Sequence, residues 1–134
     1  MPDTIDVAIA SQADVERARR EIRQLALAVG FDRINAEQVT LAASELATNL
    51  LKYALEGRIS ATALTGLRAG LQIDSHDAGP GLPDIPSALR EGYSTGGSLG
   101  GGLPGVLRLM DEVTVESSPT GTHIIGRKWL PQAS

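Results

Sequence analysis

The chain has 134 residues, of which 42% are hydrophobic, and its formal net charge is −4. This length and hydrophobic content are sufficient for a single domain with one core, and we expect that domain to span residues 1–134. This charge, with no cluster of Lys and Arg, gives no field that would attract nucleic acid or an anionic membrane. Cysteine is absent, which excludes disulfides and thiolate metal sites. We expect neither a signal peptide nor a membrane span, and therefore a cytoplasmic protein.

The first part of the chain predicts one strand and two helices. Residues 4–10 alternate polar and apolar side chains, as in a half-buried strand. Ser11 can cap a helix whose apolar residues recur at helical spacing until Gly30. Asn35 is the predicted cap of a second helix, which runs to about Ala54 and lays one apolar stripe on the core.

Beyond this helix the apolar period changes from 3.6 to 2 residues. The predicted elements are a hairpin at 58–64 and 70–77, a long loop at 78–103, a helix from Pro104 to Met110, and strands at 112–117 and 122–129. The loop is rich in glycine, as binding loops and lids often are. This order predicts an α/β fold of the α+β two-layer type, with helices on one face of a largely antiparallel, mixed sheet.

The second predicted helix carries a possible catalytic group. Glu45 and Asn49 are four residues apart and therefore project from the same side of a helix, with Lys52 one turn further on. The amide oxygen of Asn49 could bind Mg²⁺, Glu45 could act as a general base, and Lys52 could contact a phosphate. The alternative is three polar residues on a solvated helix face.

A second candidate lies at the end of a predicted strand. The carboxylate of Asp77 can accept a hydrogen bond from an exocyclic amine such as that of adenine. Gly79 and Gly81, which follow it, let the backbone approach a ligand closely. The alternative is an ordinary turn stabilised by an aspartate hydrogen bond.

A third candidate is the glycine run before the helix at Pro104. Gly100, Gly101, Gly102 and Leu103 lead directly into this helix, and free N–H groups at a helix N-terminus favour phosphate. The run matches a dinucleotide fingerprint in letters only, because no first strand of a βαβ unit precedes it and no acidic residue follows at the required distance. The alternative is a flexible linker.

Four residues outside these three groups could also have a role. His76 and His123 are far apart in the sequence and lie on separate predicted strands, so we assign neither a role. Trp129 fits a core or edge position better than a ligand platform. Thr122 follows a turn glycine and is either a turn residue or a contact to the base.

Taken in order, these segments resemble the GHKL ATPases with the Bergerat fold. Residues 45–49 resemble the N-box, 77–81 the G1 box, 100–103 the G2 box, and 121–122 the later glycine-threonine motif. Within this superfamily the whole chain is similar to the small serine/threonine kinases of anti-sigma and switch type, and most similar to the stressosome switch kinases. The segments that carry this likeness are 44–47, 79–85, 92–95 and 102–112.

The resemblance implies an ATP site with defined roles. Asn49 would hold Mg²⁺, Glu45 would be the general base for a protein hydroxyl, Asp77 would read adenine, and a lid at about 92–103 would close over the phosphates. Ser98 and Gly101 make this lid more polar and richer in glycine than the family pattern. The implied partners are STAS-domain scaffold proteins as substrates and a PP2C-type phosphatase that the released kinase binds and activates.

Two functions from different classes remain open. The first is a protein kinase, which the presence of Glu45 favours. The second is a nucleotide-gated binding module, either an anti-sigma factor that binds a sigma factor or a phosphatase activator. A histidine kinase is disfavoured, because no second domain carries a phospho-accepting histidine and neither histidine lies on a predicted helix.

Overall fold

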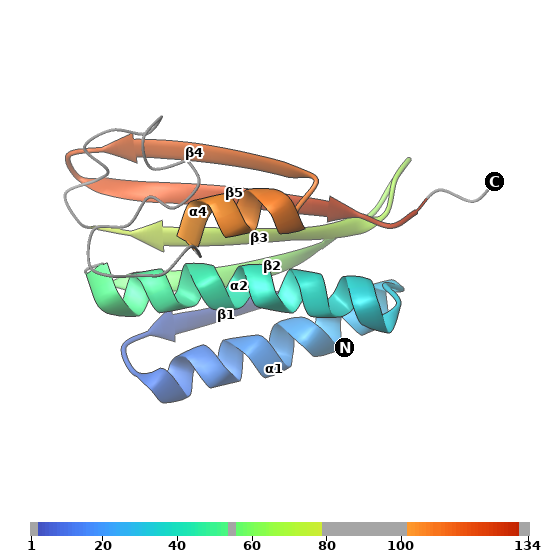
Figure 1. Cartoon of the computed structure of the whole chain (residues 1–134), viewed down its shortest axis with the longest axis horizontal. Helices are drawn as coiled ribbons and strands as arrows, with labels where there is room; N and C mark the ends of the chain where they lie inside the picture. Colours follow the sequence, from blue (N-terminus) through green and yellow to red (C-terminus); the bar gives the residue numbers. More distant parts are fainter. Residues whose placement is uncertain (1–2, 54–55, 79–101, 132–134) are drawn as a thin grey trace.

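The computed structural model describes residues 3–53, 56–78 and 102–131, and their elements are shown in Figure 1. They are β1 (Thr4–Ile9), α1 (Gln12–Val29), α2 (Arg33–Tyr53), β2 (Gly57–Leu64), β3 (Gly70–Asp77), α4 (Gly102–Leu109), β4 (Glu112–Ser118) and β5 (Gly121–Trp129). Every element that the sequence predicts within these residues is confirmed in type. Among the described residues, no helix is both long and apolar enough to span a membrane.

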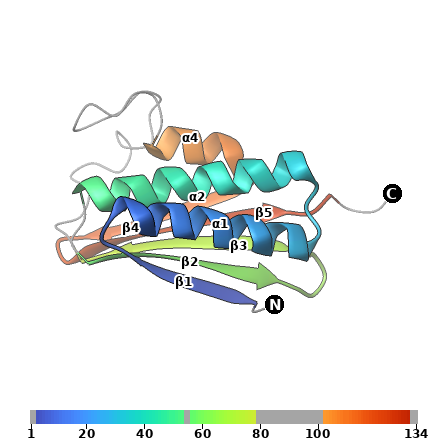
Figure 2. The same cartoon turned by 90° about the horizontal axis from the view of Figure 1, so that it is seen from below.

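The five strands form one sheet in the order β1-β2-β3-β5-β4, and all four pairings are antiparallel. The last strand of the chain, β5, is therefore inserted between β3 and β4. The three helices among the described residues cover the same face of the sheet, as Figure 2 shows. The predicted two-layer arrangement of helices on one face of a largely antiparallel sheet is confirmed, but the described sheet is wholly antiparallel rather than mixed.

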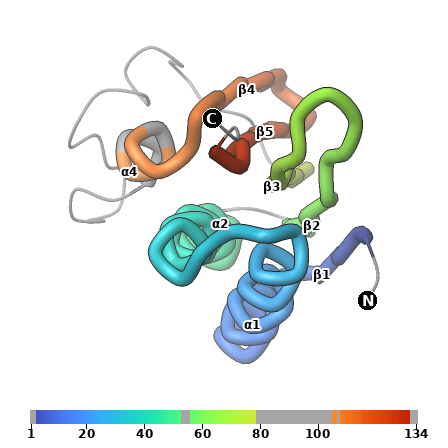
Figure 3. The backbone as a smooth tube through the Cα atoms, turned by 90° about the vertical axis from the view of Figure 1, so that its right-hand side faces the viewer, coloured from blue at the N-terminus to red at the C-terminus, as the bar shows by residue number. Residues whose placement is uncertain are grey.

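The core fills the space between the helices and this covered face, here called the inner face of the sheet. Alternation along each strand sends every second side chain inward. The largest fully buried apolar side chains include Ile22 and Leu25 of α1, Leu46 of α2, Ile59 of β2, and Leu71 and Ile73 of β3. The end-on view in Figure 3 shows α1 and α2 packed side by side against the sheet.

The predicted start of α1 is confirmed in atomic detail. The backbone N–H of Asp14 donates to the hydroxyl of Ser11 (3.4 Å), and the backbone N–H of Ser11 donates to the Asp14 carboxylate (3.1 Å). These reciprocal bonds form a capping box, which satisfies donors that the helix itself leaves unpaired. Gly30 ends the helix with a φ of 122°, a conformation that favours glycine.

Two predicted helix boundaries are wrong. The cap of α2 is Asp32 rather than Asn35, because the helix begins at Arg33 and the Asp32 carboxylate accepts the N–H of Asn35 (2.8 Å). Phe31 is buried and draws the connection onto the core, which places Asp32 at the helix start. The last helix begins at Gly102 rather than at Pro104, because proline is tolerated throughout a first helical turn. Ala54, the predicted end of α2, lies outside the described residues.

Candidate functional site

The helix α2 carries the first group of predicted site residues. Leu46 and Leu50 face the core and are buried, whereas Glu45 and Asn49 flank this apolar stripe and are half-buried. Lys52 is exposed in the last turn of the helix. Glu45 and Asn49 thus share a helix side, as predicted from their spacing, at a position where both groups are partly shielded from water.

The strands β3 and β5 carry the second group. Asp77 and Thr122 lie directly opposite each other in the β3–β5 register. Both belong to the inner face, because Ile73 and Ser75, which precede Asp77 at alternate positions, are buried. The Thr122 hydroxyl is buried and lies 3.1 Å from the hydroxyl of Ser117 on β4.

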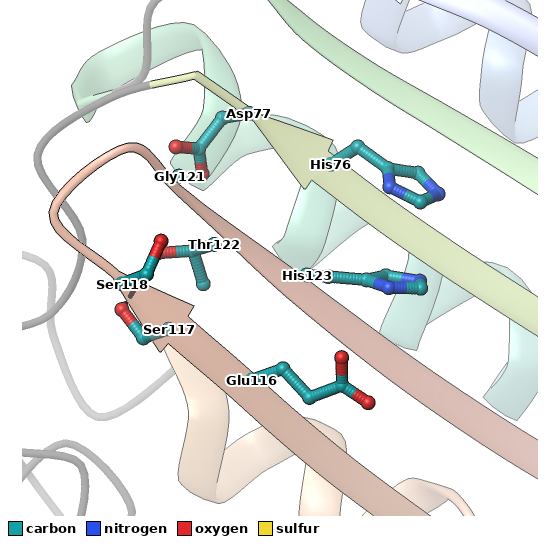
Figure 4. Close-up of a pocket in the computed structure, with 8 residues that line it drawn as sticks. All are labelled: His76, Asp77, Glu116, Ser117, Ser118, Gly121, Thr122 and His123. Carbon is teal, nitrogen blue, oxygen red and sulfur yellow. Dashed lines mark hydrogen bonds between the residues drawn. The ribbon is translucent and has the colours of Figure 1, made fainter.

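A glycine is required where these two strands meet. A Cβ atom added to Gly121 would lie 2.3 Å from the carbonyl oxygen of Asp77, which is closer than any real contact. The absent side chain therefore allows the start of β5 to lie against the end of β3. An open pocket of about 300 Å³ at this end of the sheet is shown in Figure 4. Its lining includes Asp77, Gly121 and Thr122, together with His76, Glu116, Ser117, Ser118 and His123.

The helix α4 continues the glycine run, as predicted. It begins at Gly102, and its C-terminal end is held to the sheet by the Lys128 ammonium, which donates to the carbonyl of Leu109 (3.0 Å). A cation at this end of a helix also complements the helix dipole. Met110 packs over Gly126, where an added Cβ would lie 3.4 Å from the methionine Cγ and Cε. The contacts of β5 thereby fix the helix that the glycine run enters.

The predicted site residues that the structure describes collect at one end of the molecule. The C-terminal end of α2, the end of β3 and the start of β5 lie together at the left of Figure 1. Gly79, Gly81, Gly100, Gly101 and most of the predicted lid at 92–103 lie outside the described residues.

One arrangement of side chains was not predicted from the sequence. His76 and His123 are far apart in the sequence, yet the β3–β5 register places them opposite each other, with their rings stacked 3.9 Å apart. Asp74 on β3 binds His123, with 2.7 Å between the carboxylate Oδ2 and Nε2. The only signal in the sequence was the alternation of Asp74 and His76 on one strand face, and the pairing with β5 could not be read from it.

Trp129 lies at the end of β5 and is half-buried, with its indole N–H donating to Glu112 (2.8 Å) and the Arg68 guanidinium 5.3 Å from the ring centroid. These contacts place it at the end of the sheet rather than in the core.

The sequence matches the model of the histidine kinase-like ATPase domain over residues 9–128. Over 132 residues, it is also 42% identical to the serine/threonine-protein kinase RsbT of Bacillus subtilis, and the match covers 97% of this chain and 99% of that protein. The likeness expected from the motifs, to GHKL proteins and to a stressosome switch kinase, is thereby confirmed.

The solved structures that share the fold include the following two. One is the crystal structure of the RsbU and RsbW domains of a Mycobacterium tuberculosis protein, with a TM-score of 0.67 and 17% identity over 98% of this chain and 34% of that chain. The other is the histidine kinase domain of a blue-light activated kinase from Erythrobacter litoralis, with a TM-score of 0.53 and 21% identity over 87% of this chain and 59% of that chain. At these identities the two matches support the fold alone.

Proposed function

This chain belongs to the family of histidine kinase-like ATPase domains, and we propose that it acts as a protein kinase that transfers the γ-phosphate of ATP to Ser or Thr of a partner protein. The observation that carries the proposal is the 42% identity, over nearly the whole of both chains, to a protein named a serine/threonine kinase. The half-buried Glu45 of α2 supplies the group that the chemistry requires.

Glu45 is the proposed general base. Its carboxylate would accept the proton of the attacking hydroxyl while the new bond from that oxygen to the γ-phosphorus forms and the bond to the β-phosphate oxygen breaks, so that ADP leaves. Partial burial suits this role, because neighbouring atoms restrict the rotamers of a half-buried side chain and so help to keep its carboxylate in position. Lys52, which is exposed one turn beyond Asn49, is the proposed phosphate contact on α2.

The donor set at this end of the molecule fits Mg²⁺ and ATP. Asn49 offers an amide oxygen, a hard ligand of the kind that Mg²⁺ accepts beside water and phosphate. When bound, the ion would offset negative charge on the phosphates. Asp77 would accept a hydrogen bond from the adenine amino group, and Thr122, opposite Asp77, would contact the base.

The glycines complete the proposed site. Gly79 and Gly81 would allow close approach of the chain after β3, and the run of Gly100, Gly101, Gly102 and Leu103 would present N–H groups to the phosphates as part of a lid at about 92–103. The start of α4 at Gly102 supports a helix N-terminus on the phosphate side.

We extend the proposal to partners. STAS-domain proteins are the proposed substrates, and a PP2C-type phosphatase is the proposed target of the released kinase, as the resemblance to stressosome switch kinases implies. The net charge of −4 supports protein partners rather than nucleic acid or membrane, and a cytoplasmic location is proposed with them.

The decisive experiment follows radiolabelled γ-phosphate from Mg-ATP to a STAS-domain protein encoded beside this one. Wild type is compared with Glu45→Gln, which keeps the size of the side chain but cannot accept the proton. We expect the rate of transfer to fall by about 10²- to 10⁴-fold, the usual contribution of a general base, while ATP binding is retained. Glu37→Gln is the matched control, because Glu37 lies on the same helix but is exposed and paired with Arg23.

The other possible outcomes distinguish the kinase from the second candidate function. No label with either protein, together with ATP-dependent binding to the scaffold, a phosphatase or a sigma factor, would replace the kinase with a nucleotide-gated binding module. Equal label with wild type and Glu45→Gln would remove Glu45 from the catalytic role.

A further inference from the structure

We propose that Asp74, His76 and His123 form a binding site for a divalent transition-metal ion, with Zn²⁺ as the best match, on the outer face of the sheet. Here the outer face is the one opposite the helices. The chain contains only two histidines, and folding stacks them on neighbouring strands with 3.9 Å between ring centroids and 24° between ring planes. The Asp74 carboxylate joins the pair through its 2.7 Å contact with His123.

The donor atoms are close enough for one ion. Each of the three residues offers one ligand atom, and these atoms lie within 4.8 Å of one another. Ligands of a tetrahedral Zn²⁺ with bonds near 2.1 Å lie about 3.4 Å apart, so the donors must converge by a small amount. Rotation of the rings about their Cβ–Cγ bonds supplies this convergence, because such torsions have broad energy wells.

The chemistry of the three donors selects the class of metal. Two imidazole nitrogens and one carboxylate oxygen suit Zn²⁺ and related ions such as Co²⁺, whereas Mg²⁺ prefers oxygen ligands alone. Three protein ligands leave a fourth position for water. In the bound state, the metal would replace the hydrogen bond that now joins Asp74 to His123.

A chain of hydrogen bonds orients the carboxylate. Arg127 donates from Nε to the side-chain oxygen of Gln72 (2.8 Å), and the Gln72 amide donates to Oδ1 of Asp74 (2.8 Å). The other oxygen of Asp74, Oδ2, is the one turned to His123. Such outer contacts fix the direction of metal ligands in proteins and raise affinity.

The surrounding charges tolerate a cation. Arg58 lies opposite His76 on β2, but its guanidinium is engaged with the carboxylate of Asp6 at 2.9 and 3.1 Å. Glu116 lies opposite His123 on β4, and in Figure 4 its carboxylate and both imidazole rings extend to the same side of the sheet. A dication at the rings would therefore meet negative charge from both Asp74 and Glu116.

The site lies on the opposite face of β3 and β5 from Asp77 and Thr122, which follow or precede the two histidines by one residue. A bound ion would join β3 to β5 directly beside these residues. The inference does not depend on kinase activity, because metal binding is measured without nucleotide.

The test is calorimetric titration of the full chain, metal-free and without an affinity tag, with Zn²⁺. We expect one ion per chain for wild type, a loss of affinity of about tenfold or more for His76→Gln or His123→Gln, and no binding at this site when both are changed. Glu16→Gln, which alters an exposed carboxylate on α1, is the matched control and should bind as wild type does.

Further measurements distinguish binding at this site from nonspecific binding at the surface and from misfolding of the variants. Co²⁺ should give visible absorption bands in wild type that are absent in the double variant, and Zn²⁺ should raise the unfolding temperature of wild type and of Glu16→Gln but not that of the double variant. Far-ultraviolet circular dichroism checks that the variants are folded. The proposal is overturned if Zn²⁺ in excess gives neither heat nor a thermal shift with wild type, or if the folded double variant binds Zn²⁺ equally well.

Discussion

At the scale of single residues, Asp77 is the side chain that best tests the nucleotide proposal. It ends β3 on the inner face, opposite the buried Thr122. Asp77→Asn removes the charge that strengthens a hydrogen bond from an adenine amine, so we expect ATP affinity to fall by about 10- to 100-fold. Titration with a fluorescent ATP analogue measures this change.

Glu116→Gln is the control for Asp77→Asn. Glu116 lines the same pocket, but its side chain belongs to the outer face, and the control should bind the analogue as wild type does. Unchanged affinity in Asp77→Asn would show that this carboxylate does not accept a hydrogen bond from adenine.

Asp14 is the residue whose ionisation should affect stability. Hydrogen bonds, chiefly from the backbone N–H of Ala10 and also from Ser11, lower the pKa of its carboxyl in the folded chain. A lowered folded-state pKa means that the ionised group stabilises the fold above its unfolded pKa, and that this contribution is lost as the pH falls through the folded-state pKa.

We therefore expect Asp14→Asn to lower the unfolding temperature at neutral pH. The difference from wild type should shrink towards zero as the pH falls below the usual range of an aspartate. Thermal unfolding followed by circular dichroism across this range is the measurement. A difference that stays constant with pH would mean that Asp14 acts through the geometry of the cap and not through its charge.

At the scale of elements, the junction of β3 and β5 depends on Gly121. An alanine there would place its Cβ 2.3 Å from the Asp77 carbonyl oxygen, and backbone cannot yield as a flexible side chain can. We expect Gly121→Ala to lower the free energy of unfolding by about 1–3 kcal/mol, the usual cost of overpacking, and to weaken ATP binding. Urea unfolding and the ATP titration measure the two effects.

Gly105→Ala is the matched control for stability. Gly105 lies within α4 and, among the residues that the structure describes, an added Cβ there would meet only the end of the Arg108 side chain, at 3.9 Å. Alanine there should raise the free energy of unfolding by up to about 1 kcal/mol, because glycine is a poor helix former. If both variants had equal stability, the junction would be able to relax without cost.

At the scale of the whole molecule, α2 joins the core to the candidate site. Leu46 is 1% exposed and lies next to Glu45 on the helix. Leu46→Ala should lower the free energy of unfolding by about 2–5 kcal/mol, because neighbouring side chains fill the resulting cavity only in part. The total free energy of unfolding of a domain of this size is about 5–15 kcal/mol, so the midpoint of urea unfolding should fall markedly.

Leu67→Ala gives the comparison, since Leu67 is fully exposed and its loss should change stability by less than about 0.5 kcal/mol. Similar midpoints for the two variants would mean that α2 is not held by the packing at Leu46.

Local patterns along the chain are sufficient to predict the helices and strands and their types. Alternation in 4–10, the capping pair Ser11 and Asp14, and the apolar stripe through Leu46 are set by near neighbours, so they can be predicted without knowledge of the fold. The errors at Asn35 and Pro104 concern the residues at which two helices begin, and such boundaries are hard to predict from sequence. The first boundary depends on the burial of Phe31, and the second on the fact that a first helical turn accepts proline. The spacing of Glu45 and Asn49 is also a local feature of the sequence, and their predicted position on the same side of a helix is confirmed.

The contacts between distant residues, in contrast, depend on how the strands are arranged in the folded chain. The insertion of β5 between β3 and β4 sets the register that pairs Asp77 with Thr122 and His76 with His123, and no short stretch of sequence encodes that register. It follows from burial of one whole sheet face under the helices, because a shift by one residue would turn every buried side chain of the strand outward. Local motifs in the sequence therefore predict the parts of the candidate nucleotide site, whereas the histidine pair on the outer face is visible only in the folded chain.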